Sequence, residues 1–179
     1  KGYENPNYAN VAYPYSYDPP YVPTKNPMGV YERSFDITDE TRNTYIIFEG
    51  VSSCLELYIN GQYVGYSQGS HLQAEFDITN FVNRGSNTVT AKVRKWCSGS
   101  YLEDQDFFRF NGIFRDVYIL SRPVGHIKDI KITTEDNIIN VDFEGCAKVS
   151  LYDASKILLD SASVSGKAIF KVDNPIKWN

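Results

Sequence analysis

Short segments in which apolar and polar residues alternate, separated by turn residues, recur through most of this 179-residue chain and restrict its fold. In one of them, Val89, Ala91 and Val93 fall on one face of a predicted strand and polar residues fall on the other. Asn60-Gly61, between two such segments, strongly predicts a hairpin turn. No segment keeps a helical period over its length. The chain is therefore predicted to be all-β.

The first two thirds of the chain show this alternation most regularly. The predicted strands there are 30–37, 44–49, 55–59, 63–67, 74–78, 87–96 and 113–121. Many short strands at close intervals predict an antiparallel sandwich or jelly roll. The pattern resets at Arg122-Pro123, so we place a domain boundary there, with a first domain at 1–121 and a second at 122–179.

The second domain is shorter. Its predicted strands are 126–134, 137–144, 147–152, 157–163 and 168–172. An immunoglobulin-like sandwich needs about seven strands. The second domain is therefore predicted to be truncated.

Residues 1–29 contain six of the chain's eight prolines. Proline fixes φ and lacks a backbone donor, which excludes helix and leaves only edge pairing. Tyrosines between the prolines, together with Val11, Val22 and Met28, favour an extended arm laid on a folded surface over disorder.

Composition excludes several classes of protein. The net charge is −4 and no run of Lys or Arg exceeds two residues, which argues against nucleic-acid binding. No apolar stretch approaches the roughly 20 residues of a membrane helix. Cys54, Cys97 and Cys146 lack the spacing of a disulfide framework or zinc site, so Cys54 and Cys146 are predicted to be small core residues. A reducing compartment is favoured.

The segment 98–116 is a long loop predicted between two strands, and it combines acidic and aromatic residues. Its carboxylates are Glu103, Asp104 and Asp106. Glycoside hydrolysis needs two carboxyl groups about 5 to 10 Å apart, but neighbours on one loop can meet that distance by accident. A sugar- or cation-binding loop, and a solvated loop with ion pairs to Arg109 and Arg115, are the other interpretations. No nucleophile elbow, phosphate-binding loop or dinucleotide fingerprint occurs, so catalysis by this chain alone is not expected.

Motifs with fixed spacing run along the whole chain. They are Gly2-Tyr3-x-x-Pro6-x-Tyr8-x-Asn10-Val11-x-Tyr13-Pro14, Tyr21-Val22-Pro23-Thr24-x-Asn26-Pro27-x-Gly29, Phe48-x-Gly50-Val51, Asn60-Gly61-x-x-Val64-Gly65-Tyr66, Glu75-Phe76-Asp77, Gly99-Ser100-Tyr101-Leu102-Glu103-Asp104-Gln105-Asp106, Gly112-Ile113-Phe114-Arg115-Asp116 and Asn174-Pro175-x-x-Trp178. Through these motifs the chain resembles the amino-terminal region of β-galactosidases of glycoside hydrolase family 2.

The resemblance implies a jelly-roll, sugar-binding-like first domain and an immunoglobulin-like second domain. A (β/α)₈ barrel follows in that family and carries both catalytic glutamates of a retaining mechanism. This chain would then be a non-catalytic N-terminal fragment, with no catalytic residue of its own. The parent enzyme would hydrolyse terminal β-D-galactosides such as lactose.

The resemblance assigns substrate contacts to Asn10, Val11 and Asp106. Asp106 would contact a galactose hydroxyl and help to hold an active-site sodium ion, whose other ligands come from the barrel. A carboxylate suits both tasks, since it is a hard oxygen ligand and accepts hydroxyl hydrogen bonds. Magnesium would belong to the barrel, and the fragment alone would bind no cofactor.

The implied partners are a β-galactoside, the barrel of the same chain and further copies in a homo-oligomer, without nucleic acid or membrane. A cytoplasmic location is expected, with a secreted or periplasmic one left open.

The chain departs from the family at Cys97-Ser98, where an acidic residue is frequent, and at Phe108, where Trp is common. Two alternatives are a free-standing carbohydrate-binding module and a structural domain pair from a related β-glucuronidase or β-mannosidase.

Overall fold

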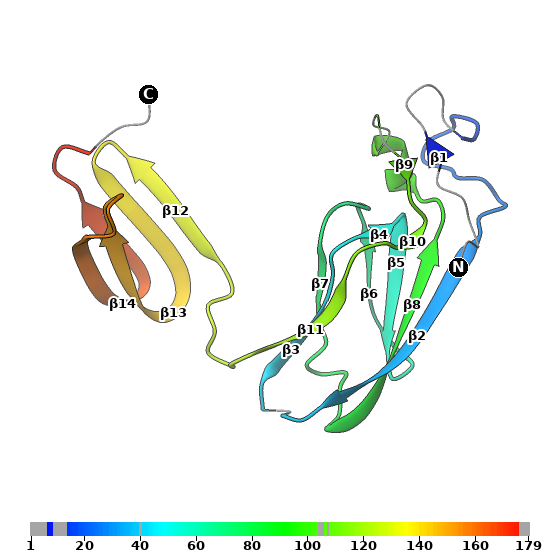
Figure 1. Ribbon diagram of the computed structural model, residues 1–179, viewed down its shortest axis with the longest axis horizontal. Coiled ribbons are helices and arrows are strands. Elements are labelled where there is room, and N and C mark those ends of the chain that lie inside the picture. Colours follow the sequence, from blue (N-terminus) through cyan, green and yellow to red (C-terminus); the bar gives the residue numbers. More distant parts are fainter. Residues whose placement is uncertain (1–6, 9–13, 40, 104–105, 107, 176–179) are drawn as a thin grey trace. The chain divides into compact units, whose positions relative to one another are not determined.

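The computed structural model describes residues 7–8, 14–39, 41–103, 106 and 108–175, and Asn7 by its backbone only (Figure 1). Among these residues the regular elements are strands, apart from one 3₁₀-helix of five residues. The prediction of an all-β chain is therefore confirmed. None of the helices in the described ranges is long and apolar enough to cross a membrane. Contacts divide the chain into two units, Lys1–Pro123 and Val124–Asn179.

The first unit contains two main antiparallel sheets. The four-stranded sheet has the order β2-β8-β5-β6, formed by β2 (Met28–Ile37), β8 (Gly85–Arg94), β5 (Cys54–Ile59) and β6 (Gln62–Gln68). The three-stranded sheet has the order β11-β3-β7, formed by β11 (Val117–Arg122), β3 (Asn43–Phe48) and β7 (Ala74–Asp77). Two short pairs complete the unit, β4 (Val51–Ser52) with β10 (Gly112–Ile113), and β1 (Asn7–Tyr8) with β9 (Phe108–Arg109).

The core of this unit lies between the two main sheets. Ile46 and Phe48 of β3 pack in one buried cluster with Leu55 and Leu57 of β5 and Val93 of β8. Because residues alternate between the two faces of a strand, the members of this cluster on β3 and on β5 are two positions apart. The unit is the jelly-roll sandwich that the sequence predicts.

The predicted Asn60-Gly61 hairpin joins β5 to β6, with Ile59 paired to Gln62. Both turn residues have positive φ, 51° and 78°, as a two-residue hairpin turn of the mirror-image type requires. The Asn60 side chain also donates to Asn87 Oδ1 at 2.8 Å and accepts from the Thr88 N–H at 2.9 Å. These contacts fix the hairpin against β8.

The second unit is one antiparallel sheet of three strands, β12 (Ile130–Glu135), β13 (Ile138–Tyr152) and β14 (Leu158–Lys171). The prediction of five strands was wrong, since four of the predicted segments merge into β13 and β14. Gly145 and Gly166 adopt positive φ, so the backbone bulges there while the ladder resumes beyond them. Val141, Phe143, Ala168 and Phe170 form its buried cluster, as in a partial immunoglobulin-like sandwich.

The three cysteines are free and occupy different environments. Cys54 and Cys97 are buried, whereas Cys146 is exposed, so its prediction as a core residue was wrong. Ala147 and Val149 pack against the cluster of the second unit. The alternation along β13 therefore turns Cys146 to the opposite face.

Candidate functional site

The acidic loop begins in a firmly held segment. After Trp96, the chain forms the 3₁₀-helix η1 (Ser98–Leu102), in which the Ser100 N–H donates to the Cys97 carbonyl at 2.9 Å. Ser100 and Tyr101 are buried, and the Tyr101 hydroxyl donates to the Tyr21 carbonyl at 2.6 Å. The first part of the loop is thus a packed element and not a solvated excursion.

The turn after β6 holds η1 at both ends. Gln68 Oε1 accepts from the Gly99 N–H at 2.8 Å, and a Cβ at Gly99 would lie 2.5 Å from that oxygen. At the other end, the Glu103 carboxylate accepts from the Ser70 N–H at 2.6 Å and from the Ser70 hydroxyl at 2.7 Å. Glu103 is half-buried and therefore acts as an anchor for the loop.

The two arginines of the loop contact backbone carbonyls. Arg109 is buried, donates from Nη2 to the Ser100 carbonyl at 2.7 Å and lies over the Trp96 ring. Arg115 donates from Nη1 to the Glu49 and His71 carbonyls, both at 3.3 Å. These contacts brace the backbone of the loop.

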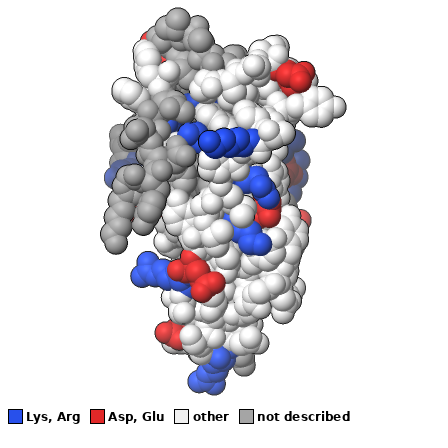
Figure 2. Space-filling view, turned by 90° about the vertical axis from the view of Figure 1, so that its right-hand side faces the viewer, with Lys and Arg blue, Asp and Glu red and all other residues white. Residues whose placement is uncertain are grey.

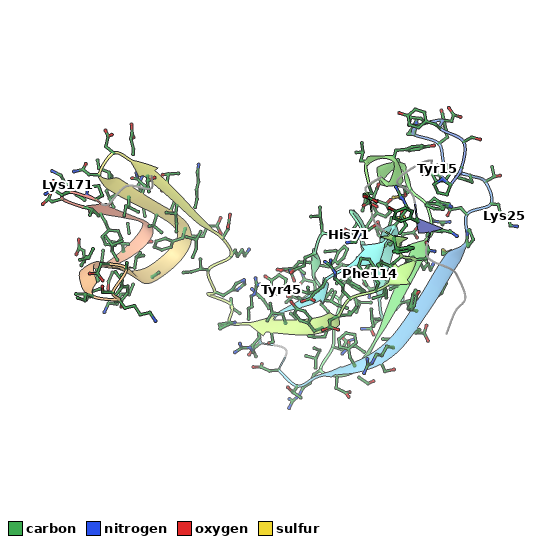
Figure 3. The ribbon with its side chains drawn as sticks, turned by 45° about the horizontal axis from the view of Figure 1, so that its top comes forward. Tyr15, Lys25, Tyr45, His71, Phe114 and Lys171 are labelled. Carbon is green, nitrogen blue, oxygen red and sulfur yellow. The ribbon has the colours of Figure 1, made fainter. Side chains whose placement is uncertain are left out.

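Phe114 adds a side-chain contact near the base of the loop. Its ring lies 5.2 Å from the His71 ring, and Figure 3 shows the two side chains close together. The Phe110 ring also packs against Phe114, with 5.6 Å between the ring centroids. Aromatic packing therefore fixes the end of the loop where it returns to the sandwich.

Asp106 has a different environment from Glu103. It is exposed, and Tyr8 donates its hydroxyl proton to Asp106 Oδ1. The Tyr8 ring packs on Phe108 with 5.3 Å between ring centroids. The hydrogen bond to Asp106 raises the pKa of Tyr8, since ionisation would remove the donor and place two negative charges together.

The pairing of β1 with β9 brings this part of the arm to the acidic loop, at the same end of the first unit (Figure 1). The sequence predicts Asn10, Val11 and Asp106 as one site. Asn10, Val11 and Asp104 lie outside the described residues, so their contacts stay predictions. Tyr8 stands two positions before Asn10 in the sequence, and it is Tyr8 that the structure brings to Asp106.

The surface around Asp106 is aromatic. Tyr8, Phe108 and Phe110 are all exposed on the described surface of the loop and arm. Within the described ranges, no group of three His, Cys, Asp or Glu side chains could hold a metal ion. An exposed carboxylate next to an aromatic side chain suits a sugar, because its oxygens accept hydroxyl hydrogen bonds.

A buried thiol pair lies under η1. Cys97 Sγ is 3.1 Å from the Ser53 hydroxyl, which also bonds the Ser100 hydroxyl at 2.7 Å. A hydrogen bond from the Cys54 thiol, and others from Ser53 and Ser100, lower the pKa of Cys97 to about 6. The same bond to Cys97 and burial raise the pKa of Cys54.

Sequence reasoning missed three of these contacts, those of Tyr8 with Asp106, Ser70 with Glu103 and Cys54 with Cys97. Tyr8 stood inside a quoted motif, but only Asn10 and Val11 were assigned a role there. Nothing in the sequence marked Ser70 as the partner of Glu103, since a serine after a glycine is typical of many turns. Cys54 and Cys97 are too far apart in the sequence for spacing to pair them.

Comparison with known families decides what the first unit is. The family described as "Glycosyl hydrolases family 2, sugar binding domain" matches residues 1–123. The chain belongs to this family. The matched region contains both β1 and the acidic loop, so the site around Asp106 lies entirely within the family 2 domain.

Curated relatives of this family 2 chain are β-galactosidases. The chain is 48% identical to that of Actinobacillus pleuropneumoniae over 134 residues, which cover 75% of this chain and 13% of that protein. It is 46% identical to the β-galactosidase of Enterobacter cloacae, with 100% of this chain and 20% of that protein covered. The β-galactosidase of Staphylococcus xylosus is 41% identical, with 99% and 19% covered. The chain thus spans a fifth or less of these relatives.

Solved structures of β-glucuronidases share the fold. The enzyme from Bifidobacterium dentium, in complex with coumarin-3-O-glucuronide, gives a TM-score of 0.65 at 22% identity, covering 81% of this chain and 33% of that chain. The β-D-glucuronidase of Dictyoglomus thermophilum gives 0.61 at 23% identity, covering 84% and 31%. At such low identity the likeness concerns the fold alone, a jelly-roll domain followed by an immunoglobulin-like one.

Proposed function

We propose that this family 2 chain is the non-catalytic N-terminal part of a retaining β-galactosidase that hydrolyses terminal β-D-galactosides such as lactose. In this proposal the chain supplies substrate contacts to a (β/α)₈ barrel, which carries both catalytic glutamates. The observation that carries the proposal is the meeting of β1 with the acidic loop, where an exposed carboxylate, Asp106, stands among exposed aromatic rings. The identity to curated β-galactosidases supports galactose as the sugar.

Asp106 accepts hydrogen bonds from a galactose hydroxyl in this proposal. Asn10 is assigned a further hydroxyl contact, and Val11 an apolar wall. Contacts away from the reacting bond fix the sugar relative to the catalytic groups and can lower the barrier by orientation alone. Substrate binding and positioning are thus the work of this chain, and bond cleavage is the work of the barrel.

The exposed apolar surface of the loop supports a covering partner. Leu102 is 88% exposed, and Tyr8, Phe108 and Phe110 lie on the same arm and loop at 53%, 54% and 44%. Large apolar side chains exposed on one arm and loop, two of them in contact with each other, are consistent with a surface that a partner covers. The partner proposed here is the barrel of the same chain, in an enzyme that forms a homo-oligomer.

The proposal assigns one ion contact to this chain, that of Asp106 with sodium. Asp106 is the residue that would help to hold sodium, which would supply positive charge beside the bound sugar; magnesium is assigned to the barrel. Figure 2 shows acidic and basic side chains interspersed among uncharged ones on the described part of the face that it presents. Three free thiols, two of them buried together, support a reducing compartment such as the cytoplasm.

The test uses the full-length enzyme that contains this segment. Hydrolysis of an aryl β-galactoside is compared with that of the matching β-glucuronide and β-mannoside, with sodium or potassium chloride at equal ionic strength. Galactoside cleavage that sodium stimulates is the expected result. Cleavage of another glycoside would refute the substrate, and equal rates in both salts would refute the cation role of Asp106.

A free-standing carbohydrate-binding module is the second candidate, favoured by the exposed carboxylate and rings on a domain of the sugar-binding family. It predicts that the 179-residue chain by itself binds galactose with sub-millimolar affinity in calorimetry. The β-galactosidase proposal predicts no such affinity, because a large part of the site would lie in the barrel.

A further inference from the structure

We propose that Tyr8 is a positioning residue that fixes the orientation of the Asp106 carboxylate for the sugar. The inference rests on the proposed function and adds to it a residue with a specific task. Tyr8 acts through Asp106, and it ties the proline-rich arm to the acidic loop at the point where both contribute to the site.

The backbone ladder places Tyr8 beside the loop. In the register of β1 and β9, Tyr8 pairs with Phe108 and Asn7 with Arg109. Arg109 in turn is buried and bonded to the Ser100 carbonyl of η1. The position of Tyr8 is therefore set by a strand that is itself fixed to the packed part of the loop.

The side chain of Tyr8 is fixed as well. Its ring packs on Phe108, and its hydroxyl donates to Asp106 Oδ1. An exposed aspartate rotates freely about two side-chain bonds, and holding it in one orientation costs conformational entropy. The phenol hydrogen bond meets part of this cost before a ligand arrives, which is the advantage of preorganisation.

One hydrogen bond leaves capacity for a ligand. An ionised carboxylate has two oxygens with about four lone-pair sites, and the phenol takes one of them. Oδ2 and the remaining lone pair of Oδ1 can then accept sugar hydroxyls. Ser70 anchors Glu103 before Asp106, and the Ser100 carbonyl holds Arg109 after it. In the described part of the chain, these contacts hold the loop on both sides of Asp106. Tyr8 adds the contact to the Asp106 carboxylate itself.

The experiment compares Tyr8→Phe with Tyr63→Phe in the full-length enzyme. Tyr8→Phe keeps the ring on Phe108 and removes the hydroxyl. Tyr63 is a matched control, since it is 54% exposed against 53% for Tyr8, and its ring likewise contacts an aromatic neighbour, Tyr58. The readout is the inhibition constant of free galactose, which does not depend on the fraction of active enzyme.

Tyr8→Phe is expected to weaken galactose inhibition by up to roughly tenfold, because binding must then order an Asp106 side chain that the phenol no longer holds, at a cost of about 0.5–1.5 kcal/mol. Tyr63→Phe should leave the constant unchanged, and both variants should keep the melting temperature. In an Asp106→Ala background the Tyr8 substitution should have almost no further effect, because residues that act through one another are non-additive.

Equal inhibition constants for Tyr8→Phe and the unmodified enzyme, in a preparation that cleaves galactosides, would overturn the role of Tyr8 alone. So would full additivity with Asp106→Ala. Failure of the unmodified enzyme to cleave galactosides would instead overturn the proposed function, and this inference with it.

Discussion

Glu103 and Asp106 belong to the same loop, yet the structure gives them opposite surroundings. Glu103 closes η1 and is bonded twice to Ser70, whose side chain and backbone are buried. Asp106 lies beyond that anchor, exposed, with a phenol as its partner. Residue type alone did not distinguish the anchored carboxylate from the exposed one, whereas the hydrogen-bond partners and the exposure of the two side chains do.

The largest expected effect concerns the exposed carboxylate. Asp106→Ala in the full-length enzyme should lower kcat/KM about 100-fold or more, on the order of 3 kcal/mol, because the sugar loses a charged acceptor. The melting temperature should stay unchanged, since the side chain is exposed. Steady-state kinetics and calorimetry measure both quantities. An unchanged kcat/KM would remove Asp106 from the site.

The second prediction concerns the anchor and should show the opposite pattern. Glu103→Ala leaves the buried Ser70 N–H and hydroxyl without their acceptor, at a cost of about 1–3 kcal/mol. Chemical denaturation should therefore show a lower unfolding free energy. Glu49→Ala is a suitable control, because only the Glu49 backbone is used by Arg115. Equal stability of the two variants would contradict the anchoring role.

The third prediction concerns the pH dependence of stability, through Cys97 at the start of η1. Its folded pKa is lowered from 9.0 to about 6, so between these values the unfolded state binds more protons. The unfolding free energy should therefore rise with pH from about 6 to 9, and the raised pKa of Cys54 should reverse the trend above that range. Cys97→Ser should flatten the rise in urea titrations performed at several pH values. A rise of the same slope in Cys97→Ser would assign it to other groups.

Local pattern and turn chemistry predicted much of the fold. The alternation around Ala91 and Val93 identified β8 and its buried face, and Asn60-Gly61 identified the β5–β6 hairpin. The second unit was predicted less well, because turn-like residues such as Gly145 interrupt the pattern without ending the strand. Period-two alternation cannot distinguish a bulge from a turn without knowledge of the partner strand.

The sequence predicted the candidate site only in part. Asp106 was selected through a family motif. The structure shows that its side chain is exposed, as a ligand-binding role requires. The contact with Tyr8 depends on the pairing of β1 with β9, which joins segments far apart in the chain. Such long-range pairings carry no local sequence signal, and the same holds for Glu103 with Ser70.

The most direct measurement places the two carboxylates side by side. The galactose inhibition constant and the melting temperature are determined for Asp106→Ala and Glu103→Ala in the full-length enzyme. The predicted result is weakened inhibition at an unchanged melting temperature for Asp106→Ala, and a lowered melting temperature with a nearly unchanged inhibition constant for Glu103→Ala. Unchanged inhibition in Asp106→Ala would contradict the assignment of this loop to the sugar site.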